Sequence, residues 1–427
     1  MYSILVTCFL QFEWVTMVNS SKIVFLIISL NFIAIASSAA ASELPDGKGK
    51  AAVQAICSAC HNVNRISTSL GYSREHWLAL IDSMVDLSSN KTQQNMMADY
   101  LAENFPPTTN RAPTLIEGSS KVEFKEWVVP TLGQRSRDPV EAPDGSIWWV
   151  GQWGNVMGRI DPETGNMQEY PLPPGAKPHS VTPDKDGFMW YTGNKNATIG
   201  RLDPADGKVK VYEMPDPQAR DPHTAVFDKN GILWFTLQHS NRIGRLDPKS
   251  GEIKLIVAPT SGSRPYGIKV DESGDIWVAC NGSNCLIKVD HNTLEMTEIK
   301  LPHEDTTVRR LDIAADGMIW YVNSGRGRLG QYNPISGEIR EWPSPSGAKS
   351  HPYAIEVIDG VVWYNESGMR PDSLVRFDPK NETFQSWAIP SGEFYAGIIR
   401  HMRPTSDGNL LIHQSSTNRI IQVNIGK

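Results

Sequence analysis

The chain has 427 residues, more than one hydrophobic core usually serves, so the sequence predicts two domains. A net charge of −6, with no block of Lys and Arg, argues against a protein that binds nucleic acid. With 34 Gly, 29 Pro and 13 Trp, the composition is typical of many short strands and turns and not of long helices.

The N-terminus has the pattern of an export signal. A basic residue precedes the apolar run 23–36, and the small residues 39–41 provide a cleavage site. We expect residues 1–41 to be a signal peptide, with Met17 as an alternative start that gives a more usual signal length. Retention as a membrane anchor is the other interpretation, but the apolar run is short for a span. We therefore expect a periplasmic or secreted protein with no stable membrane span.

Residues 57–61, Cys-Ser-Ala-Cys-His, have the form of a covalent haem attachment motif. Cysteines three positions apart on one helical turn can each bond a vinyl group, and the histidine then faces the iron. A bare C-x-x-C would also suit a thioredoxin-like pair or a zinc site, but the adjoining histidine and the lack of a second such pair disfavour both. We expect one haem c, attached at Cys57 and Cys60, with His61 as proximal iron ligand.

The rest of the segment 43–115 is expected to form a small all-α domain. One helix begins at Ser73, and a second covers about residues 91–105. Apolar residues recur at helical spacing in both, at Trp77, Leu80, Ile81 and Met84 in the first and at Met97, Tyr100, Leu101 and Phe105 in the second. These faces would close over the haem.

Three methionines are candidates for the distal ligand of the haem iron: Met84, Met96 and Met97. Core packing is the alternative role for each, because Met fills gaps well. The segment resembles small class I cytochrome c domains, in which C-x-x-C-H is followed by W-x-x-x-(I/V)-x-x-M and then Y-L-A. Here the middle pattern falls on residues 77–84, so the resemblance implies that Met84 is the distal ligand.

From residue 121 to the end, a turn that contains glycine is followed by a marker tryptophan about every 43 residues. The marker positions are Trp148, Trp190, Trp234, Trp277, Trp320, Trp363 and, in the last repeat, Leu411. Four short strands at this period predict the blades of a β-propeller, and there are seven repeats. The seventh lacks a fourth strand, so we expect residues 121–130 to close the last blade.

This repeat resembles the virginiamycin B lyase family of seven-bladed propellers. The resemblance extends over about 300 residues, and includes a later strand of the form Ile-Gly-Arg-Leu-Asp-Pro at 199–204 and 243–248. It implies an all-β propeller at 121–427, behind the small α domain. Pattern similarity of this kind indicates a fold before it indicates a function.

One position in each repeat should face the mouth of the central channel. Eleven residues before the markers stand Arg137, His179, His223, Tyr266, Arg309 and Arg400, and Tyr353 takes this place in the sixth blade. Their convergence predicts a pocket for a polar or anionic ligand, with histidines available for proton transfer. The alternative is that they cap the channel through hydrogen bonds to water and backbone.

The family resemblance also implies a catalytic arrangement. A channel His in one blade is followed, in the next, by Glu-x-His and by a Glu three residues past the Trp; the two Glu hold Mg²⁺ and the His residues act as acid and base. Here His179 takes the first place, and Asp221 and His223 take the next two. Leu237 replaces the last Glu, and Mg²⁺ missing one of two carboxylates would be held weakly. Lyase activity with Mg²⁺ is therefore an alternative hypothesis.

Cys280 and Cys285 flank a short turn, and a disulfide across it is feasible outside the cytoplasm. Two free buried thiols are the alternative.

The sequence thus favours an exported c-type cytochrome. Electron transfer with a periplasmic donor or acceptor would be linked to a propeller that binds a small-molecule or anionic ligand. The alternatives are a lyase or hydrolase with an accessory haem domain, and a propeller that only binds. Whether the propeller is catalytic is left open.

Overall fold

The computed structural model describes residues 44–59, 62–67, 69, 71–107, 111–390 and 398–426. The expected signal peptide lies outside the described residues, as do Cys60 and His61. The helices and strands described below belong to one unit, Leu44–Lys427. Within these ranges, no helix combines the length and the apolar character needed to cross a bilayer.

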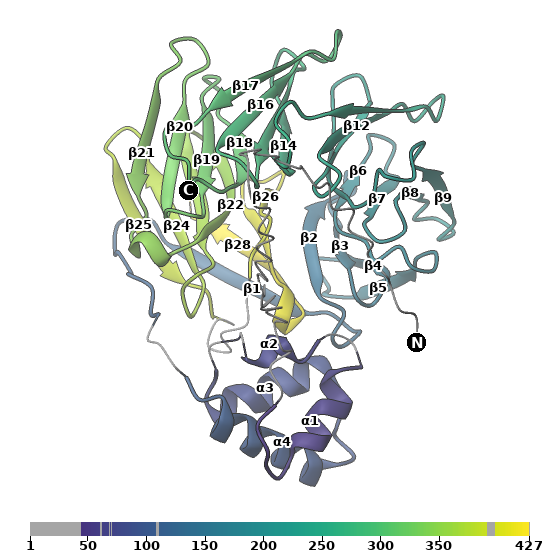
Figure 1. Ribbon diagram of the computed structural model, residues 1–427, viewed down its shortest axis with the longest axis vertical. Coiled ribbons are helices and arrows are strands. Elements are labelled where there is room, and N and C mark those ends of the chain that lie inside the picture. The colour runs from purple at the N-terminus through teal and green to yellow at the C-terminus, as the bar shows by residue number, and fades with distance from the viewer. Residues whose placement is uncertain are drawn as a thin grey trace, which may run out of the picture. The chain divides into compact units, whose positions relative to one another are not determined.

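The first part of this unit is helical (Figure 1). Its helices are α1 (Lys50–Cys57), α2 (Asn64–Ser67), α3 (Arg74–Met84) and α4 (Lys91–Asn104). The Ser73 hydroxyl caps α3 by accepting a hydrogen bond from the His76 amide, and the Asn90 side chain caps α4 in the same way from Gln93. Such caps satisfy amides that a helix leaves unpaired at its start.

One apolar core holds the four helices together. Trp77 and Ile81 of α3 pack there with Met97 and Leu101 of α4, all nearly inaccessible to solvent. Met97 is completely buried, so its thioether is part of this core. Met84, at the end of α3, is only half-buried at the edge of the same cluster.

The remainder of the chain is a seven-bladed β-propeller, and each blade is a four-stranded antiparallel sheet. Blade one consists of β2 (Ser136–Glu141), β3 (Ile147–Gly151), β4 (Val156–Ile160) and β5 (Met167–Pro171), and blade two of β6 (Val181–Pro183), β7 (Met189–Gly193), β8 (Thr198–Leu202) and β9 (Val209–Glu213). Blade three consists of β10 (Pro222–Phe227), β11 (Leu233–Leu237), β12 (Arg242–Leu246) and β13 (Ile253–Val257), and blade four of β14 (Pro265–Val270), β15 (Ile276–Cys280), β16 (Cys285–Val289) and β17 (Met296–Lys300).

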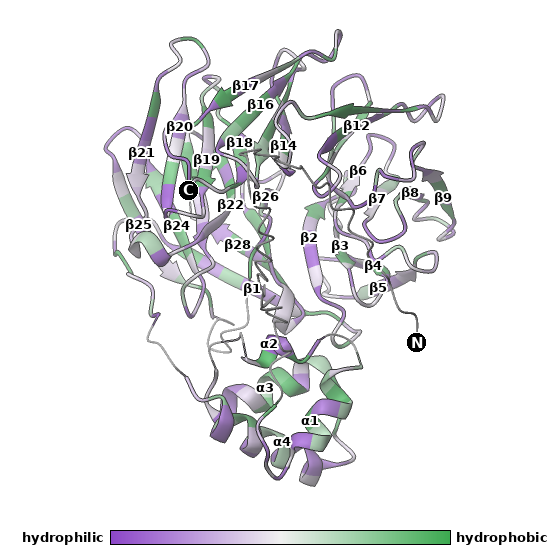
Figure 2. Ribbon diagram, in the orientation of Figure 1, coloured by the Kyte–Doolittle hydropathy of each residue, from purple (hydrophilic) through white to green (hydrophobic). Residues whose placement is uncertain are grey.

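Blades five and six are β18 (Val308–Ile313), β19 (Ile319–Asn323), β20 (Arg328–Tyr332) and β21 (Ile339–Pro343); β22 (Pro352–Ile358), β23 (Val361–Glu366), β24 (Ser373–Asp378) and β25 (Thr383–Ala388). Two short 3₁₀ helices are η1 (Gly347–Lys349) and η3 (Ser415–Thr417). Hydrophobic residues concentrate in the strands and hydrophilic residues in the loops that join them (Figure 2).

The seventh blade contains both ends of the propeller sequence. It consists of β26 (Arg403–Pro404), β27 (Leu410–Gln414), β28 (Arg419–Ile425) and β1 (Val122–Val128). The segment expected to close the ring contains β1, which pairs antiparallel with β28 from Val122 opposite Ile425 to Val128 opposite Arg419. This pairing leaves no open edge between the last blade and the first.

The repeated residues build each blade in the same way. The marker Trp190 donates its indole hydrogen bond to Asp184 at 2.8 Å and stacks on Tyr212 of the fourth strand, with ring centroids 5.5 Å apart. Next to it, Tyr191 covers Gly200 of the third strand so closely that a Cβ there would come within 2.1 Å of the ring. The repeated glycine is therefore required by packing.

Several contacts join the helical segment to the propeller. The Ser83 carbonyl, at the end of α3, accepts hydrogen bonds from the Asn418 side chain at 2.7 Å and from the Gly133 amide at 3.1 Å. On another side, the Arg370 guanidinium donates to the Ser69 carbonyl and lies 5.0 Å from the centre of the Tyr72 ring. These contacts place the helical segment against the sixth and seventh blades and the start of the first.

The structure does not contain the disulfide that we considered between Cys280 and Cys285. Both are buried free thiols at the ends of β15 and β16. The Cys285 thiol is directed to Glu298, 3.3 Å from its Oε1, and also contacts the Ser283 hydroxyl. The alternative of two free buried thiols is therefore the one that the structure has.

Candidate ligand pocket at the propeller mouth

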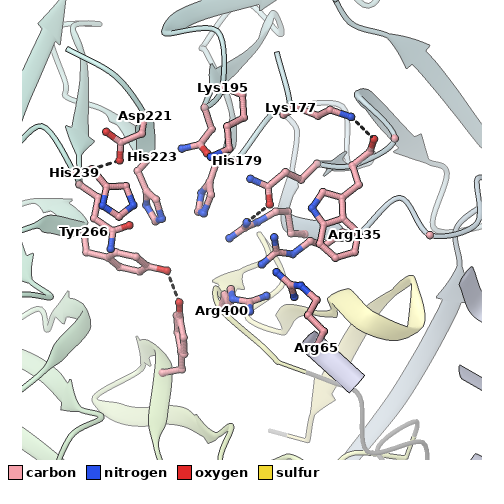
Figure 3. A pocket seen from close by; sticks show the side chains of 18 of the residues that line it. Arg65, Arg135, Lys177, His179, Lys195, Asp221, His223, His239, Tyr266 and Arg400 are labelled. Carbon is pink, nitrogen blue, oxygen red and sulfur yellow. Dashed lines mark hydrogen bonds between the residues drawn. The ribbon is translucent and has the colours of Figure 1, made fainter. Parts of the chain in front are cut away.

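A cavity of about 730 Å³ opens at the end of the channel where the first strand of each blade begins (Figure 3). All eight propeller residues proposed from the sequence for this mouth line it: Arg137, His179, Asp221, His223, Tyr266, Arg309, Tyr353 and Arg400. They meet because equivalent positions of the repeat lie at the same end of the channel.

A left-handed turn precedes several of these residues. In five blades the residue two positions before the mouth residue has a φ between 44° and 62°. These residues are Arg135, Lys177, Asp221, Arg264 and His351. Such a conformation costs about 1–3 kcal/mol for a residue with a side chain, and it tends to persist at functional sites. Arg135, Lys177 and Asp221 are thereby brought into the pocket beside the residues that follow them.

Two histidines form the buried floor of one side of the pocket. The rings of His179 and His223 are 3.5 Å apart between centroids, and the His223 ring is 4.1 Å from that of Tyr266. Burial, with added repulsion from Arg137, holds the pKa of each imidazole well below its usual value. Both are therefore neutral at pH 7 and able to accept a proton.

Hydrogen bonding distinguishes the two imidazoles. His223 Nδ1 is 2.9 Å from the Thr224 hydroxyl, whereas His179 Nδ1 is buried without a hydrogen-bond partner among the described residues. An unpaired buried nitrogen is costly unless something else binds it. His179 is thus placed to receive a ligand group.

Two tyrosines adjoin the histidines. Their hydroxyls, of Tyr266 and Tyr353, share a hydrogen bond, and the Arg309 guanidinium lies 5.7 Å and 5.0 Å from the two ring centres. Burial raises the pKa of Tyr266. Burial acts in the same direction on Tyr353, but the charges of Arg400 and Arg309 outweigh it and lower the pKa of that phenol. Tyr353 is the more acidic of the pair.

Asp221 is the one carboxylate among the described residues that line the pocket. Its Oδ2 accepts a hydrogen bond from the His239 amide at 2.9 Å, while Oδ1 has no partner among the described residues. Burial raises the pKa of this carboxyl. Gln238 and His239, which follow the buried Leu237 and lie out of register with the expected metal ligand, line the pocket as well.

A group of arginines occupies the opposite side of the pocket (Figure 3). Arg65 of α2 and Arg135 both lie over the Trp153 ring, 5.1 Å and 5.0 Å from its centre, and Arg400 is close to them. Burial, together with the nearby charges of Arg400, Arg137 and Arg65, lowers the pKa of Arg135 to about 8. Arg65, Arg135 and Trp153 were not among the residues predicted from the sequence.

Arg137 lies deeper than these three, with 1% of its surface exposed. It donates one hydrogen bond to Gln152 at 2.8 Å, but its Nε and second terminal nitrogen are buried without partners among the described residues. Burial lowers its pKa to about 10; Arg400 adds to this shift, and the neighbouring Asp138 opposes it. Guanidinium nitrogens left in this state favour an anion.

The balance of charge in the pocket is strongly positive. Among the described residues, seven basic side chains line it against the single acid Asp221: Arg65, Arg135, Arg137, Lys177, Lys195, Arg309 and Arg400. In the described part of the chain, no ion pair involves Arg135, Arg137, Arg309 or Arg400. Mg²⁺ does not fit these residues, because it needs carboxylates and would lie among guanidinium groups. An anion does fit.

The channel beyond the mouth differs in character. Asp138 pairs with His401 at 3.1 Å and lies 3.9 Å from Arg310. Further along the inner strands, the Lys269 ammonium pairs with Asp312 at 2.8 Å and Glu356 at 2.9 Å. These charges are buried and paired, whereas those of the mouth are not.

The sequence matches the virginiamycin B lyase family over residues 108–289. A comparison with curated proteins finds no match.

Solved structures of the same kind are similar to this chain. Virginiamycin B lyase from Staphylococcus aureus has 24% identity and a TM-score of 0.64, with 71% of this chain and 99% of that chain covered. A streptogramin B lyase has 23% identity and a TM-score of 0.65, covering 71% and 98%. A catalytically inactive histidine-to-alanine form of the S. aureus enzyme with quinupristin has 26% identity and a TM-score of 0.62, covering 71% and 99%. The propeller is therefore lyase-like in fold.

Proposed function

We propose that this chain is an exported c-type cytochrome whose propeller binds an anionic substrate or partner next to the haem. One observation carries the proposal: Ala59, inside the haem attachment motif, and Arg65 line the same cavity as the residues of the propeller mouth. A ligand in the mouth would then lie beside the attachment point. Short separation of this kind favours electron exchange between the two.

The described residues of the helical segment suit a haem. Cys57 ends α1 and packs, half-buried, against the helical core, and the thioether of Met84 is at the edge of the same core. Other half-buried apolar residues pack against the same core, among them Ile56, Val63 and Val85. Cys57 and Cys60 would hold the haem through thioether bonds, and His61 and Met84 would bind its iron. Bound haem would supply one-electron transfer.

The propeller residues would bind and orient the ligand. The basic side chains attract an anion, and Arg can hold a carboxylate or phosphate through two parallel hydrogen bonds. His179 and His223, neutral at pH 7, can take a proton that the ligand releases on oxidation, and the Tyr266–Tyr353 pair can pass one on. On oxidation, the ligand would then give its proton to a residue of the pocket and its electron to the haem.

Export and haem attachment can be tested together. The chain is produced with the cytochrome c maturation machinery, and haem is detected on a denaturing gel and in oxidised and reduced visible spectra. We expect covalent haem in the periplasmic fraction that is lost in Cys57→Ser/Cys60→Ser. A sulfur-to-iron band that survives in Met84→Ala would move the distal ligand elsewhere. Haem that no anionic reductant or periplasmic donor reduces would refute electron transfer.

A lyase is the second candidate, favoured by the family match and by the adjacent histidines of the mouth. Since the residues do not fit Mg²⁺, such a lyase would use His223 as base and would not need a metal. Ring opening of a streptogramin B by the purified protein tests this, and we expect His223→Ala to abolish it while EDTA and His61→Ala do not. Absence of cleavage by the wild type would remove the lyase and leave binding at the mouth as the propeller's role.

A further inference from the structure

We propose that Arg65, Arg135 and Arg400, with Arg137 beneath them, form a subsite for an oxyanion that carries two negative charges. The subsite is composite, because α2 supplies Arg65 and the propeller supplies the others. The inference rests on the proposed anionic ligand and names its charge and the residues that hold it. Reduction of the haem does not depend on it.

The arrangement of side chains supports a built site. Arg65 and Arg135 share the Trp153 ring, at 5.1 Å and 5.0 Å, so the indole fixes both guanidinium groups. Lys177 donates to the Trp153 carbonyl at 2.8 Å and so holds the loop that carries this ring. Figure 3 shows Arg65, Arg135 and Arg400 on the same side of the pocket.

Arg137 is independent evidence for a bound ligand. It is almost completely buried in the cavity wall, and two of its three nitrogens lack hydrogen-bond partners among the described residues. Such nitrogens would cost stability if nothing paired with them, by about 1–3 kcal/mol for each unsatisfied group. An oxyanion above Arg137 would satisfy them.

Charge indicates a dianion and not a monoanion. Four guanidinium groups meet here, and Asp221, the single carboxylate among the described lining residues, lies on the opposite side beside His239 (Figure 3). One negative charge would leave most of the mutual repulsion in place, whereas two would offset more of it. A compact dianion, or two carboxylates of one molecule, matches the bidentate geometry of Arg.

Two sources could supply this chemistry: a free dianionic ligand, or the two carboxylates of the haem attached at Cys57 and Cys60. The experiment therefore uses the holoprotein and two readouts. Binding of sulfate, succinate and acetate is measured by calorimetry at constant ionic strength. The reduction potential of the haem is measured in the same variants.

The variants are Arg65→Gln, Arg135→Gln and Arg400→Gln, with Arg264→Gln as control, because Arg264 is exposed and outside the cavity. If the ligand is free, we expect sulfate or succinate to bind at least about tenfold more tightly than acetate. Each of the three substitutions should weaken that binding by about tenfold or more, and the control should not.

If the haem carboxylates fill the subsite, the holoprotein binds neither dianion, and the three substitutions lower the reduction potential while the control does not. Removing a nearby positive charge favours the oxidised haem, which sets the direction. In that case the haem-free Cys57→Ser/Cys60→Ser protein should gain the dianion site. Dianion binding and potential that are both unaffected by Arg135→Gln and Arg400→Gln would overturn the subsite. Covalent haem would still be present then, so the proposed function would stand.

Discussion

The mouth and the far end of the propeller channel hold their charged groups in opposite ways. At the far end, the Lys269 ammonium lies between two acidic side chains, those of Asp312 and Glu356. At the mouth, Arg135, Arg137, Arg309 and Arg400 make no ion pair with any described residue. The contrast indicates that the far end is structural, whereas the mouth carries positive charges that no described residue pairs with.

The largest effect should come from breaking the paired end. Lys269→Met leaves the buried Asp312 carboxylate without its cation, which typically costs about 3–5 kcal/mol. Urea unfolding of the variant measures this. Lys288→Met is the matched control, since its partner Asp275 is nearer the surface and the loss should stay below about 1 kcal/mol. Equal losses in the two variants would show that the far end is no more dependent on pairing than the surface.

A second test uses pH. Burial, and then repulsion from Asp312, raises the pKa of Glu356 to about 8, whereas an unfolded Glu titrates near about 4.3. Between these values the folded protein holds a proton that the unfolded chain lacks, so stability should fall as pH rises, by at most about 1.4 kcal/mol per unit, and level off above pH 8.

The free energy of unfolding is measured between pH 6.5 and 8.5 for the wild type and for Glu356→Gln. The variant should lack the contribution from the Glu356 proton. The buried histidines of the mouth do not interfere, because their lowered pKa values reduce stability only as pH falls below about 6.5. If the two proteins have parallel profiles over this range, Glu356 is not the titrating group.

The smallest effect should be at the mouth itself. Arg137→Met removes a buried charge that has no ion-pair partner, so the free energy of unfolding should change by less than about 1 kcal/mol and could increase. Urea unfolding without added dianion measures this, and Gln152→Met, which removes its hydrogen-bond acceptor, is a useful companion. A loss as large as that of Lys269→Met would mean that Arg137 is structural.

The sequence predicted the propeller and its mouth because both follow from a repeat. Once Trp148 and its equivalents are aligned, a fixed offset gives His179, His223 and the other mouth residues, and all of them line one cavity. Arg135 and Lys177 could have been found by moving two positions further back, where the left-handed turn recurs.

Arg65 and Trp153 could not have been predicted in this way. Arg65 reaches the pocket from α2, outside the repeat, and Trp153 belongs to a loop of the first blade. Their positions depend on how the helical segment packs against the propeller, which no period in the sequence records. Whether Cys280 and Cys285 form a disulfide could not be predicted either, because their spacing permits the bond but does not orient the sulfurs.

The pairing of β1 with β28 sets an order on biosynthesis. The strand Val122–Val128 leaves the ribosome roughly 300 residues before its partner Arg419–Ile425, so the seventh blade cannot be completed until that partner strand has been made. Contacts over such sequence separation form slowly. Arg135 follows β1, and Arg400 comes just before the first strand of the seventh blade. The pocket that both residues line can therefore be assembled only after β1 has paired with β28.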